Sequence, residues 1–325
     1  MPAVRAFMDE HFLHFNSRTA VEAARAWEAH LAAGGTMMVT LAGAMSTARI
    51  GTLLARLIRA GKVHAITCTG ANLEEDVFAL LAYQEYERIG DWRALSAADE
   101  VALLSKGMNR VTDTCIPETV MRHIEGRLAV LWRAAADGGT RRAPSEYMFD
   151  VVRDLTLAEH FQLPREASWV LAAAEAGIPV WTPGWEDSTT GNMFAAMVWE
   201  GKLPDHDCVI SGTKQMETLM RWYLDGHRAA PDAPSPGFFQ LGGGIAGDFP
   251  ICAVPCLLQD LKLDVPLWGY FCQISDAVSS YGGYSGAPPN EKITWGKLGP
   301  DTPRFMVQSD ASIVAPLVFG YVLGD

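Results

Sequence analysis

The chain has 325 residues, of which 49% are hydrophobic and 20% are charged. These proportions are typical of folded globular proteins and exclude the disordered, collagen-like and coiled-coil classes. Its 26 basic and 38 acidic side chains give a formal charge of −12, which argues against nucleic acid as a partner and favours a cationic or neutral one.

The termini carry no membrane or export signal that we can identify. The longest apolar run near an end, residues 313–323, is far shorter than the roughly 20 residues that cross a bilayer. Residues 1–10 lack the apolar core of a signal peptide, so we expect a cytoplasmic protein with no membrane partner. The six cysteines form no CxxC pair, and we expect reduced thiols in the core and no metal site.

Short apolar runs alternate with amphipathic stretches, as in parallel strands joined by crossover helices. A capping box of Thr19 and Glu22 predicts the first helix. In chain order the predicted elements are helix 19–31, strand 36–41, helix 45–60, strand 63–68, helix 74–88, an irregular segment 89–115, helices 117–136 and 146–176, strand 178–181, helix 189–200, strand 208–210, helix 212–227, strand 238–241, helix 249–262, strands 267–272 and 305–308, and a C-terminal helix.

These roughly seven β-α repeats, with no clear linker between them, predict one large α/β domain. We expect a doubly wound, Rossmann-like fold in which helices flank a mostly parallel sheet. Ligands of such sheets bind in the loops at the carboxyl ends of the strands.

Two of these loops have nucleotide-like features. Residues 242–247 match G-x-G-x-x-G between a predicted strand and helix, where glycines let a backbone approach a pyrophosphate. A tight turn that binds nothing is the alternative. Residues 69–76 end in three acidic side chains. These side chains either stabilise the N-terminus of a helix through its dipole or bind a ribose or an amine.

Two further loops are less simple to interpret. In residues 182–193 glycine, hydroxyl groups and Asp187 gather before a predicted helix, and a capped helix start explains much of this pattern. Residues 281–297 form a glycine- and proline-rich loop that ends in Trp295-Gly296-Lys297. A lysine held beside an indole in a dry pocket can attack an imine or a carbonyl carbon, whereas a solvated lysine is the ordinary alternative.

In this order and spacing the four segments resemble the deoxyhypusine synthase family, from about Thr36 to the C-terminus. The resemblance implies a catalytic set of Lys297, Glu291, Trp295 and Asp248, with Lys297 as nucleophile. It implies substrate-binding residues Asn192, Tyr281, Tyr284 and Ser285. It implies NAD-binding residues Gly43, Thr47, Thr69, Gly70, Glu75, Asp187, Gly242, Gly243, Gly244, Asp276 and Asp310. We divide the chain into an N-terminal helical extension, residues 1–35, and an NAD-binding catalytic domain, residues 36–325.

The resemblance also implies a reaction. In this family NAD takes a hydride from the carbon beside an amine, the lysine displaces the leaving amine as an enzyme imine, a second amine attacks, and the hydride returns. The sum is a redox-neutral transfer of a four-carbon unit, with NAD retained throughout. The family implies a homotetramer whose sites lie across subunit interfaces, and an acidic chain suits small cationic amines.

Several departures from the family pattern bear on the substrate. Asp248 stands where the synthases that modify the translation factor have a histidine, and Cys252 where they have an asparagine. Tyr281, Tyr284 and Asn192 replace carboxylates, each of which contributes about 1.5–3 kcal/mol as a charge-assisted hydrogen bond. Asp248 either takes the acid–base role of the histidine or caps the following helix.

We therefore expect a smaller free amine in place of spermidine. Agmatine is favoured slightly over putrescine, because a guanidinium stacks on tyrosine rings, and the product would be 1,9-bis(guanidino)-5-azanonane. A true deoxyhypusine synthase or homospermidine synthase that uses spermidine or putrescine is the alternative. A catalytically silent NAD-binding scaffold is the second. A pyridoxal enzyme is disfavoured because no phosphate-binding motif accompanies Lys297.

Overall fold

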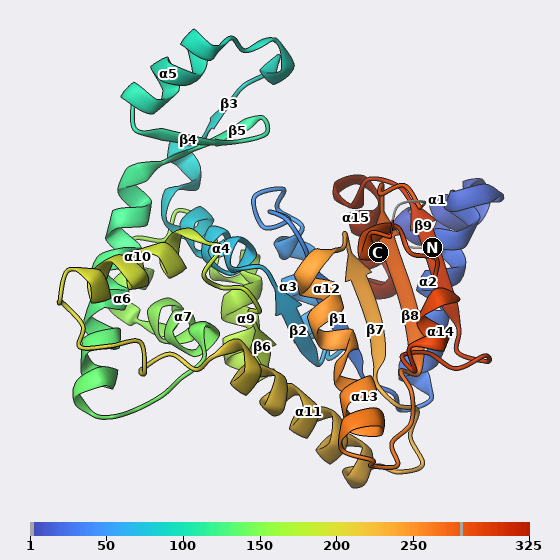
Figure 1. Ribbon diagram of the computed structural model, residues 1–325. Coiled ribbons are helices and arrows are strands. Elements are labelled where there is room, and N and C mark those ends of the chain that lie inside the picture. The colour runs from blue at the N-terminus through green and yellow to red at the C-terminus, as the bar shows by residue number, and fades with distance from the viewer. Residues whose placement is uncertain (1–2, 280–281) are drawn as a thin grey trace.

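The centre of the molecule is a six-stranded parallel sheet, seen in a computed structural model that describes residues 3–279 and 282–325 (Figure 1). Its strands are β1 (Met37–Leu41), β2 (Ala65–Cys68), β6 (Val180–Trp181), β7 (Gly237–Leu241), β8 (Tyr270–Ser275) and β9 (Arg304–Gln308). Their order in the sheet is β6-β2-β1-β7-β8-β9. Counted along the chain this is 3-2-1-4-5-6, the order of the Rossmann fold, and it confirms the predicted fold class.

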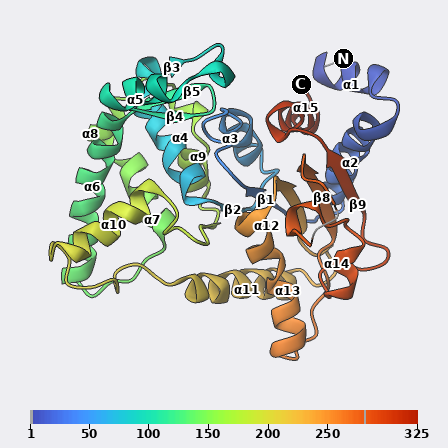
Figure 2. The same cartoon turned by 45° about the horizontal axis from the view of Figure 1, so that its top comes forward.

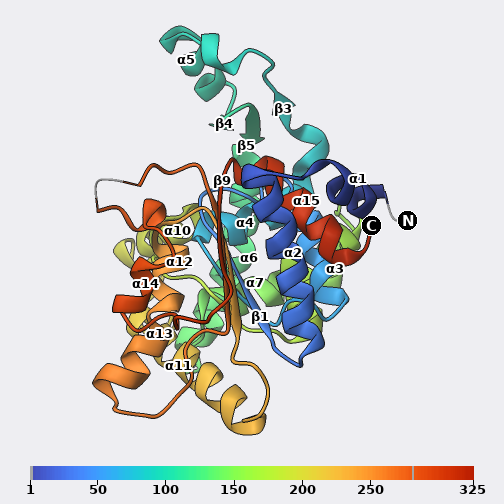
Figure 3. The same ribbon diagram turned by 90° about the vertical axis from the view of Figure 1, so that its right-hand side faces the viewer.

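Helices cover both faces of this sheet, as Figures 2 and 3 show from two directions. On one face lie α2 (Phe15–Ala32), α3 (Gly51–Arg59) and α15 (Ala311–Leu323), and on the other lie α11 (Gly212–Ala229), α12 (Gly244–Ile251) and α13 (Ala253–Pro255). Alternate strand residues supply the two cores: Phe239 packs on the α2 side with Trp27, and Phe238 packs on the α12 side with Trp268. The connection after β1 runs over one face of the sheet, and the connection after β7 runs over the other face. The gap between these two strands is therefore the expected position of a ligand.

Four polar side chains interrupt the apolar alternation on the α12 face. Thr40, Thr67, Gln240 and Gln273 stand in register across β2, β1, β7 and β8, one residue before the carboxyl ends of β2, β1 and β7, and all four are fully buried. Burial of polar groups is costly unless they find partners. These buried polar side chains therefore indicate that this part of the sheet has a role besides core packing.

Six further helices form a second body beside β2 and β6. They are α4 (Gly70–Ala82), α6 (Glu118–Asp137), α7 (Pro144–Arg153), α8 (Leu155–Ala158), α9 (Trp169–Ala176) and α10 (Thr189–Trp199), with the 3₁₀ turns Tyr83–Glu85 and Arg165–Ala167. Trp132, Trp185 and Phe194 form an aromatic cluster between α6 and α10. The predicted helix 146–176 is wrong as one element: it divides into α7, α8 and α9, with Pro164 in the gap.

An arm projects from this body (Figures 1 and 3). It consists of a three-stranded antiparallel sheet, β3 (Glu87–Arg88), β5 (Thr114–Pro117) and β4 (Met108–Val111), with helix α5 (Ala97–Ser105). The prediction that residues 89–115 are irregular is therefore wrong. Its hairpin pairs Arg110 with Cys115, and such short strands leave little periodicity to read.

Two smaller predictions also fail. Residues 208–210 add no strand to the sheet, because Val209 forms only an isolated bridge with Arg142. Helix α2 begins at Phe15, so Thr19 lies inside it and donates to the carbonyl of Phe15.

The described part of residues 1–35 consists mostly of two helices, α1 (Ala3–His11) and α2. Trp27 of α2 is fully buried against the sheet, so this extension shares the main core, and the division at residue 35 stays a prediction. All six cysteines are free. Within residues 3–279 and 282–325 no helix is long and apolar enough to cross a bilayer, and no cluster of three potential metal ligands occurs.

Candidate active site

The predicted cofactor residues follow the strands of the parallel sheet. Gly43 comes after β1, Thr69 and Gly70 after β2, Gly242 to Gly244 after β7, Asp276 after β8 and Asp310 after β9. Because all six strands are parallel, their carboxyl ends meet at one edge of the sheet. The structure thus brings these loops together at the edge where Rossmann-type folds bind ligands.

A polar network joins the first two of these loops. The side-chain amide of Asn72 donates to the Gly43 carbonyl and to Thr69 Oγ1, both at 2.8 Å, and Thr69 Oγ1 itself lies 2.8 Å from the Gly43 carbonyl. Gly43 has a φ of 57°, a conformation that glycine adopts without strain. The ends of β1 and β2 are therefore held in a defined position.

The three acidic residues of α4 do different things. Glu74 accepts hydrogen bonds from the amides of Thr189 and Thr190 at the start of α10, at 3.0 and 2.8 Å. Asp76 accepts from Ser168 at 2.5 Å. Both are buried and serve helix starts, which explains them structurally.

Glu75 is the member of the trio that faces the loop after β1. Its Oε2 accepts from Thr47 Oγ1 at 2.5 Å, and only 8% of the residue is exposed. Burial raises the pKa of Glu75 to about 7, and the nearby Glu74 acts in the same direction, whereas Thr47 acts against it. A carboxyl that titrates near neutrality at a strand end is a candidate functional group.

The glycine loop after β7 packs against the segment that contains Ser285. Gly242 and Gly244 have φ values of 74° and 62°, and a Cβ on Gly243 would lie 1.9 Å from Ser285 Oγ. The amide of Gly244 donates to Ser285 Oγ at 3.1 Å. Here glycine is required by backbone conformation and by close approach.

Two glutamines of the buried polar row fix this contact. The side-chain amides of Gln240 and Gln273 both donate to the Gly242 carbonyl at 3.0 Å, and Gln273 also donates to the Ser285 carbonyl at 2.8 Å. Gln240 Oε1 accepts from the Tyr284 hydroxyl at 2.9 Å. The 3₁₀ turn Tyr284–Gly286 is thereby attached to both β7 and β8.

Lys297 lies on the α12 face of the sheet, below the carboxyl edge. Its carbonyl accepts from the Trp268 amide at 3.3 Å, which places its backbone beside the start of β8. Its Nζ lies 3.1 Å from Asp248 Oδ1 on α12 and 5.3 Å from the centre of the Tyr284 ring. Gly296, with a φ of 66°, turns the chain after helix α14 (Glu291–Thr294). Only 8% of Lys297 is exposed.

Asp248 holds that lysine and caps no helix. The N-cap residue of α12 is Gly243, and Asp248 is the fifth residue of the helix. Its Oδ1 also accepts a hydrogen bond from the Cys252 thiol, with 3.7 Å between the sulfur and the oxygen. Burial raises the pKa of this thiol, so Cys252 stays protonated at neutral pH.

A second buried lysine, which no sequence motif indicated, lies near the same tyrosine ring. Lys292 is 3% exposed, and its Nζ lies 4.9 Å from the ring centres of both Phe271 and Tyr284. Burial lowers its pKa to about 8, and the charge of Lys297 acts in the same direction. The signal in the sequence was a lysine five residues before Lys297 in the same short loop.

In the described part of the chain the other predicted site residues form no hydrogen bond or ion pair with the Lys297 side chain. Glu291 and Trp295 are exposed, and in the described part of the chain the Glu291 carboxylate makes no hydrogen bond to Lys297. Asp187 and Asp276 are exposed, and Asp310 caps α15 by accepting from the Ser312 amide at 2.7 Å. Tyr281 lies outside the described residues.

Asn192 belongs to a different cavity. Its side-chain amide donates to the carbonyls of Ser188 and Glu186, and it lines a cavity of about 780 Å³ together with Trp185 and Lys214. The three described residues proposed to bind substrate thus lie in two places, because Tyr284 lies beside Lys297 and Ser285 contacts the glycine loop, away from Asn192.

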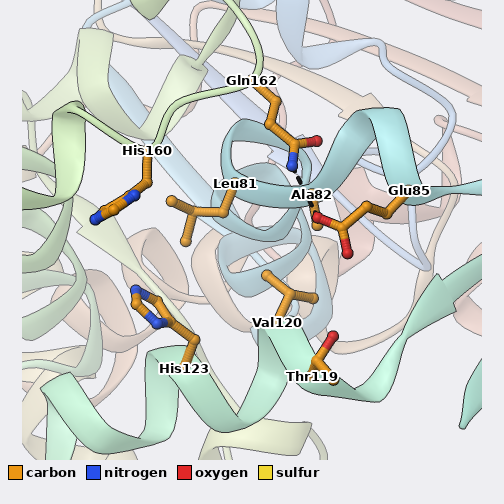
Figure 4. A pocket seen from close by; sticks show the side chains of 8 residues that line it. All are labelled: Leu81, Ala82, Glu85, Thr119, Val120, His123, His160 and Gln162. Atoms are coloured by element: carbon orange, nitrogen blue, oxygen red, sulfur yellow. Dashed lines mark hydrogen bonds between the residues drawn. The ribbon is translucent and has the colours of Figure 1, made fainter.

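A further cavity, of about 290 Å³, lies between α4 and α6 (Figure 4). His123 and His160 face each other there with ring centres 6.3 Å apart, and Gln162 donates to Glu85 at 2.8 Å. None of its lining residues is among those that contact Lys297, and two imidazoles alone do not make a metal site.

Known proteins resemble this chain over nearly its full length. The sequence model of the family described as "Deoxyhypusine synthase" matches residues 8–322. A "Deoxyhypusine synthase-like protein" of Cyanothece sp. is 30% identical over 297 residues, which cover 90% of this chain and 72% of that protein. "Probable deoxyhypusine synthase 1" of Methanosarcina acetivorans is 27% identical over 287 residues, 88% of this chain and 80% of that protein.

The fold comparison agrees with these sequence matches. A solved structure described as "a putative deoxyhypusine synthase from Entamoeba histolytica" superposes with a TM-score of 0.57 at 13% identity, and the alignment covers 98% of this chain and 90% of that one. Because the sequence identity is 13%, this match supports the fold alone. From the family match and the 30% identical relative it follows that the chain belongs to the deoxyhypusine synthase family.

Proposed function

We propose that this chain is a transferase of the EC 2.5.1 class that moves a four-carbon amine unit between two free amines through an imine on Lys297, with retained NAD. The observation that carries the proposal is the buried Lys297 amine, held by Asp248 and packed over Tyr284. A lysine in a largely apolar pocket is an amine nucleophile that forms imines with carbonyl or imine carbons.

The carboxyl edge suits NAD. A Cβ on Gly43 or Gly244 would meet no heavy atom within 4 Å, so the backbone is open to a ligand at the ends of β1 and β7. The residues that would hold NAD are Gly43, Thr47, Thr69, Gly70, Glu75, Asp187, Gly242, Gly243, Gly244, Asp276 and Asp310. When bound, NAD accepts a hydride from the carbon beside the donor amine and returns it at the end, so the sum is redox-neutral.

The protein supplies the covalent steps. The Lys297 amine adds to the imine carbon of the oxidised donor, and ammonia leaves, which gives a C=N bond between donor and lysine. The primary amine of the acceptor then adds to the same carbon and displaces Lys297. Asp248 is placed to take and return the lysine proton in these exchanges.

We propose agmatine as both donor and acceptor. Two agmatine molecules then give one 1,9-bis(guanidino)-5-azanonane and one ammonia. Tyr284 supports this choice, because its ring already attracts two amines, at 4.9 and 5.3 Å, and a guanidinium uses the same interaction. Asp248 is the carboxylate that contacts Lys297, so a donor with fewer ammonium groups than spermidine suits the pocket.

We further propose a homotetramer of cytoplasmic location, with the sites at subunit interfaces. Ile245 at the start of α12 and Trp295, two residues before Lys297 in the chain, are exposed by 51% and 63%. Apolar side chains on the rim of a site suit coverage by a second copy of the chain.

Product analysis tests this proposal. The protein is incubated with NAD and one amine at a time, and products and ammonia are measured by mass spectrometry and enzymatic assay. We expect the bis-guanidino product and one equivalent of ammonia from agmatine, without accumulation of NADH. Homospermidine from putrescine or spermidine alone would overturn the agmatine assignment, and NAD binding without any product would indicate a silent scaffold.

A further inference from the structure

We infer that Gln240 is a positioning residue, which holds the ring of Tyr284 where that ring binds the cationic end of an amine substrate. The inference rests on the proposed function, because Tyr284 is the ring to which we assign the agmatine guanidinium. Gln240 lies within strand β7, one residue before its end, and is fully buried. It therefore acts on a substrate only through another side chain.

The Tyr284 side chain is anchored at both of its ends. At the backbone end, Tyr284 begins the 3₁₀ turn Tyr284–Gly286, and the Gln273 side-chain amide donates to the Ser285 carbonyl of that turn at 2.8 Å. At the other end, the Tyr284 hydroxyl donates to Gln240 Oε1 at 2.9 Å. Hydrogen bonds of this kind fix the rotamer of a side chain that binds a ligand, so the face of the ring keeps one direction.

Gln240 is itself held in a single orientation. Its Nε2 donates to the Gly242 carbonyl at 3.0 Å. On the side of α12, a Cβ on Gly247 would lie 2.6 Å from Gln240 Cδ, so the helix backbone packs directly on the carboxamide. Because the amide nitrogen faces Gly242, the amide oxygen is the atom that meets the Tyr284 hydroxyl.

Core packing alone does not account for this contact. Methionine in place of Gln240 and phenylalanine in place of Tyr284 would fill nearly the same space, with no polar atoms to bury. What the hydrogen bond adds is a defined ring position. Lys297 Nζ lies 5.3 Å from the centre of the ring, and Tyr284 is only half-buried. The strength of a cation–π contact depends on how the ring face is directed toward the cation.

Loss of Gln240 should leave the glycine loop in place. The Gly242 carbonyl accepts from Gln273 Nε2 as well, at 3.0 Å, so it keeps a donor when Gln240 is replaced. The Tyr284 hydroxyl, in contrast, loses the acceptor to which it donates. A change at Gln240 should therefore weaken the binding of an amine and spare the binding of NAD.

Calorimetric titration of the intact protein with agmatine, in the absence of NAD, measures amine binding without turnover. We expect Gln240→Met to weaken agmatine binding about tenfold, which is the loss of a well-directed cation–π contact. The dissociation constant of NAD, titrated separately, should stay within twofold of the wild type. Gln240→Glu retains an oxygen that accepts from the Tyr284 hydroxyl and should recover most of the lost agmatine affinity.

A double-mutant cycle distinguishes positioning from a general disturbance of the site. Tyr284→Phe should weaken agmatine binding as Gln240→Met does, and the double variant should bind no more weakly than either single variant, because both changes remove the same contact. Thr67→Val is the matched control. It lies in the same buried polar row, and in the described part of the chain its hydroxyl contacts Met38, so both affinities should be unchanged.

Three results would overturn the inference: unchanged agmatine affinity in Gln240→Met, additive losses in the double variant, or an equal loss of NAD affinity. If Gln240→Met does not fold, Gln240→Leu takes its place. A merely structural role of Gln240 would lower the stability of the protein and leave the agmatine affinity of the folded variant unchanged.

Failure of the inference and failure of the proposed function give different results. A wild type that binds agmatine and converts none, with weaker binding in Gln240→Met, would refute the transferase and keep the role of Gln240. Conversion of agmatine by Gln240→Met with the KM of the wild type would refute the role of Gln240 and keep the transferase. A wild type that neither binds nor converts agmatine would overturn both.

Discussion

Lys297 and Asp248 are 49 residues apart in the chain and meet at an N–O distance of 3.1 Å. The lysine comes from the turn after α14 and the aspartate from the second turn of α12. Their contact joins the loop that resembles a catalytic motif to the helix that follows the glycine loop.

Asp248→Asn should uncouple proton transfer from imine exchange. The amide cannot take the lysine proton, so we expect turnover to fall about a hundredfold, within the range of general acid–base contributions. Asp260→Asn, at an exposed position beyond α13, is the matched control and should keep full activity. Steady-state rates of product formation test this prediction. Turnover of Asp248→Asn within twofold of the wild type would remove Asp248 from the mechanism.

Gly243→Ala should loosen the contact between the glycine loop and the Tyr284 turn. Its Cβ would lie 1.9 Å from Ser285 Oγ, so Ser285 must move, and such overpacking costs about 1–3 kcal/mol. Gly126→Ala, at a helical site with free space, should be neutral or stabilising. Urea unfolding of both variants measures the difference, and equal stabilities would contradict the described packing.

Glu75→Gln should change how stability depends on pH. The pKa of Glu75 is about 7 in the folded protein, against 4.5 as its ordinary value, so the folded state binds the extra proton between these pH values. Stability therefore falls as pH rises from about 4.5 to 7, by up to roughly 3 kcal/mol. Glutamine does not ionise, so the variant lacks this loss of stability. The unfolding free energy of the variant, relative to that of the wild type, should therefore be larger at pH 8 than at pH 4.5.

Unfolding free energies at these two pH values, from urea titrations, test the Glu75 prediction. Glu10→Gln, at an exposed position of α1, provides the control and should follow the wild type. Parallel pH profiles for Glu75→Gln and the wild type would mean that Glu75 titrates as an ordinary carboxyl.

Tyr284→Phe and Tyr284→Ala should separate the hydroxyl from the ring. The phenylalanine variant leaves Gln240 Oε1 without its donor, which costs about 1–3 kcal/mol of stability, but it keeps the ring that both lysine amines approach. The alanine variant removes that ring, and we expect kcat/KM for agmatine to fall at least tenfold further than in Tyr284→Phe. Equal kcat/KM values for the two variants would show that the ring plays no part in agmatine turnover.

The fold was largely readable from the sequence because apolar strand runs and glycine stops recur along the chain. Strands near Met37, Ala65, Phe238 and Phe305 were predicted within a few residues. The arm was not, because its strands have two to four residues and pair with one another away from the core. The antiparallel pairing of Arg110 with Cys115 depends on a turn that periodicity does not encode.

The site was readable only in part, for a related reason. Motif resemblance identified Lys297 and the glycine loop, but contacts across the fold decide what surrounds them. Tyr284, and not Trp295, is the ring beside Lys297, and Glu74 serves the start of α10. The contacts of Gln240 and Lys292 form only once the sheet face and α14 are assembled, since neither belongs to a motif with a known spacing.

Chemical trapping of the imine tests the central claim most directly. The protein is incubated with NAD and agmatine, reduced with borohydride, digested and analysed by mass spectrometry, with Lys297→Arg treated in parallel. The proposed mechanism predicts a guanidinobutyl group on Lys297 in the wild type and none in the variant. A guanidinobutyl group on another lysine, Lys292 included, or full turnover by Lys297→Arg, would contradict it.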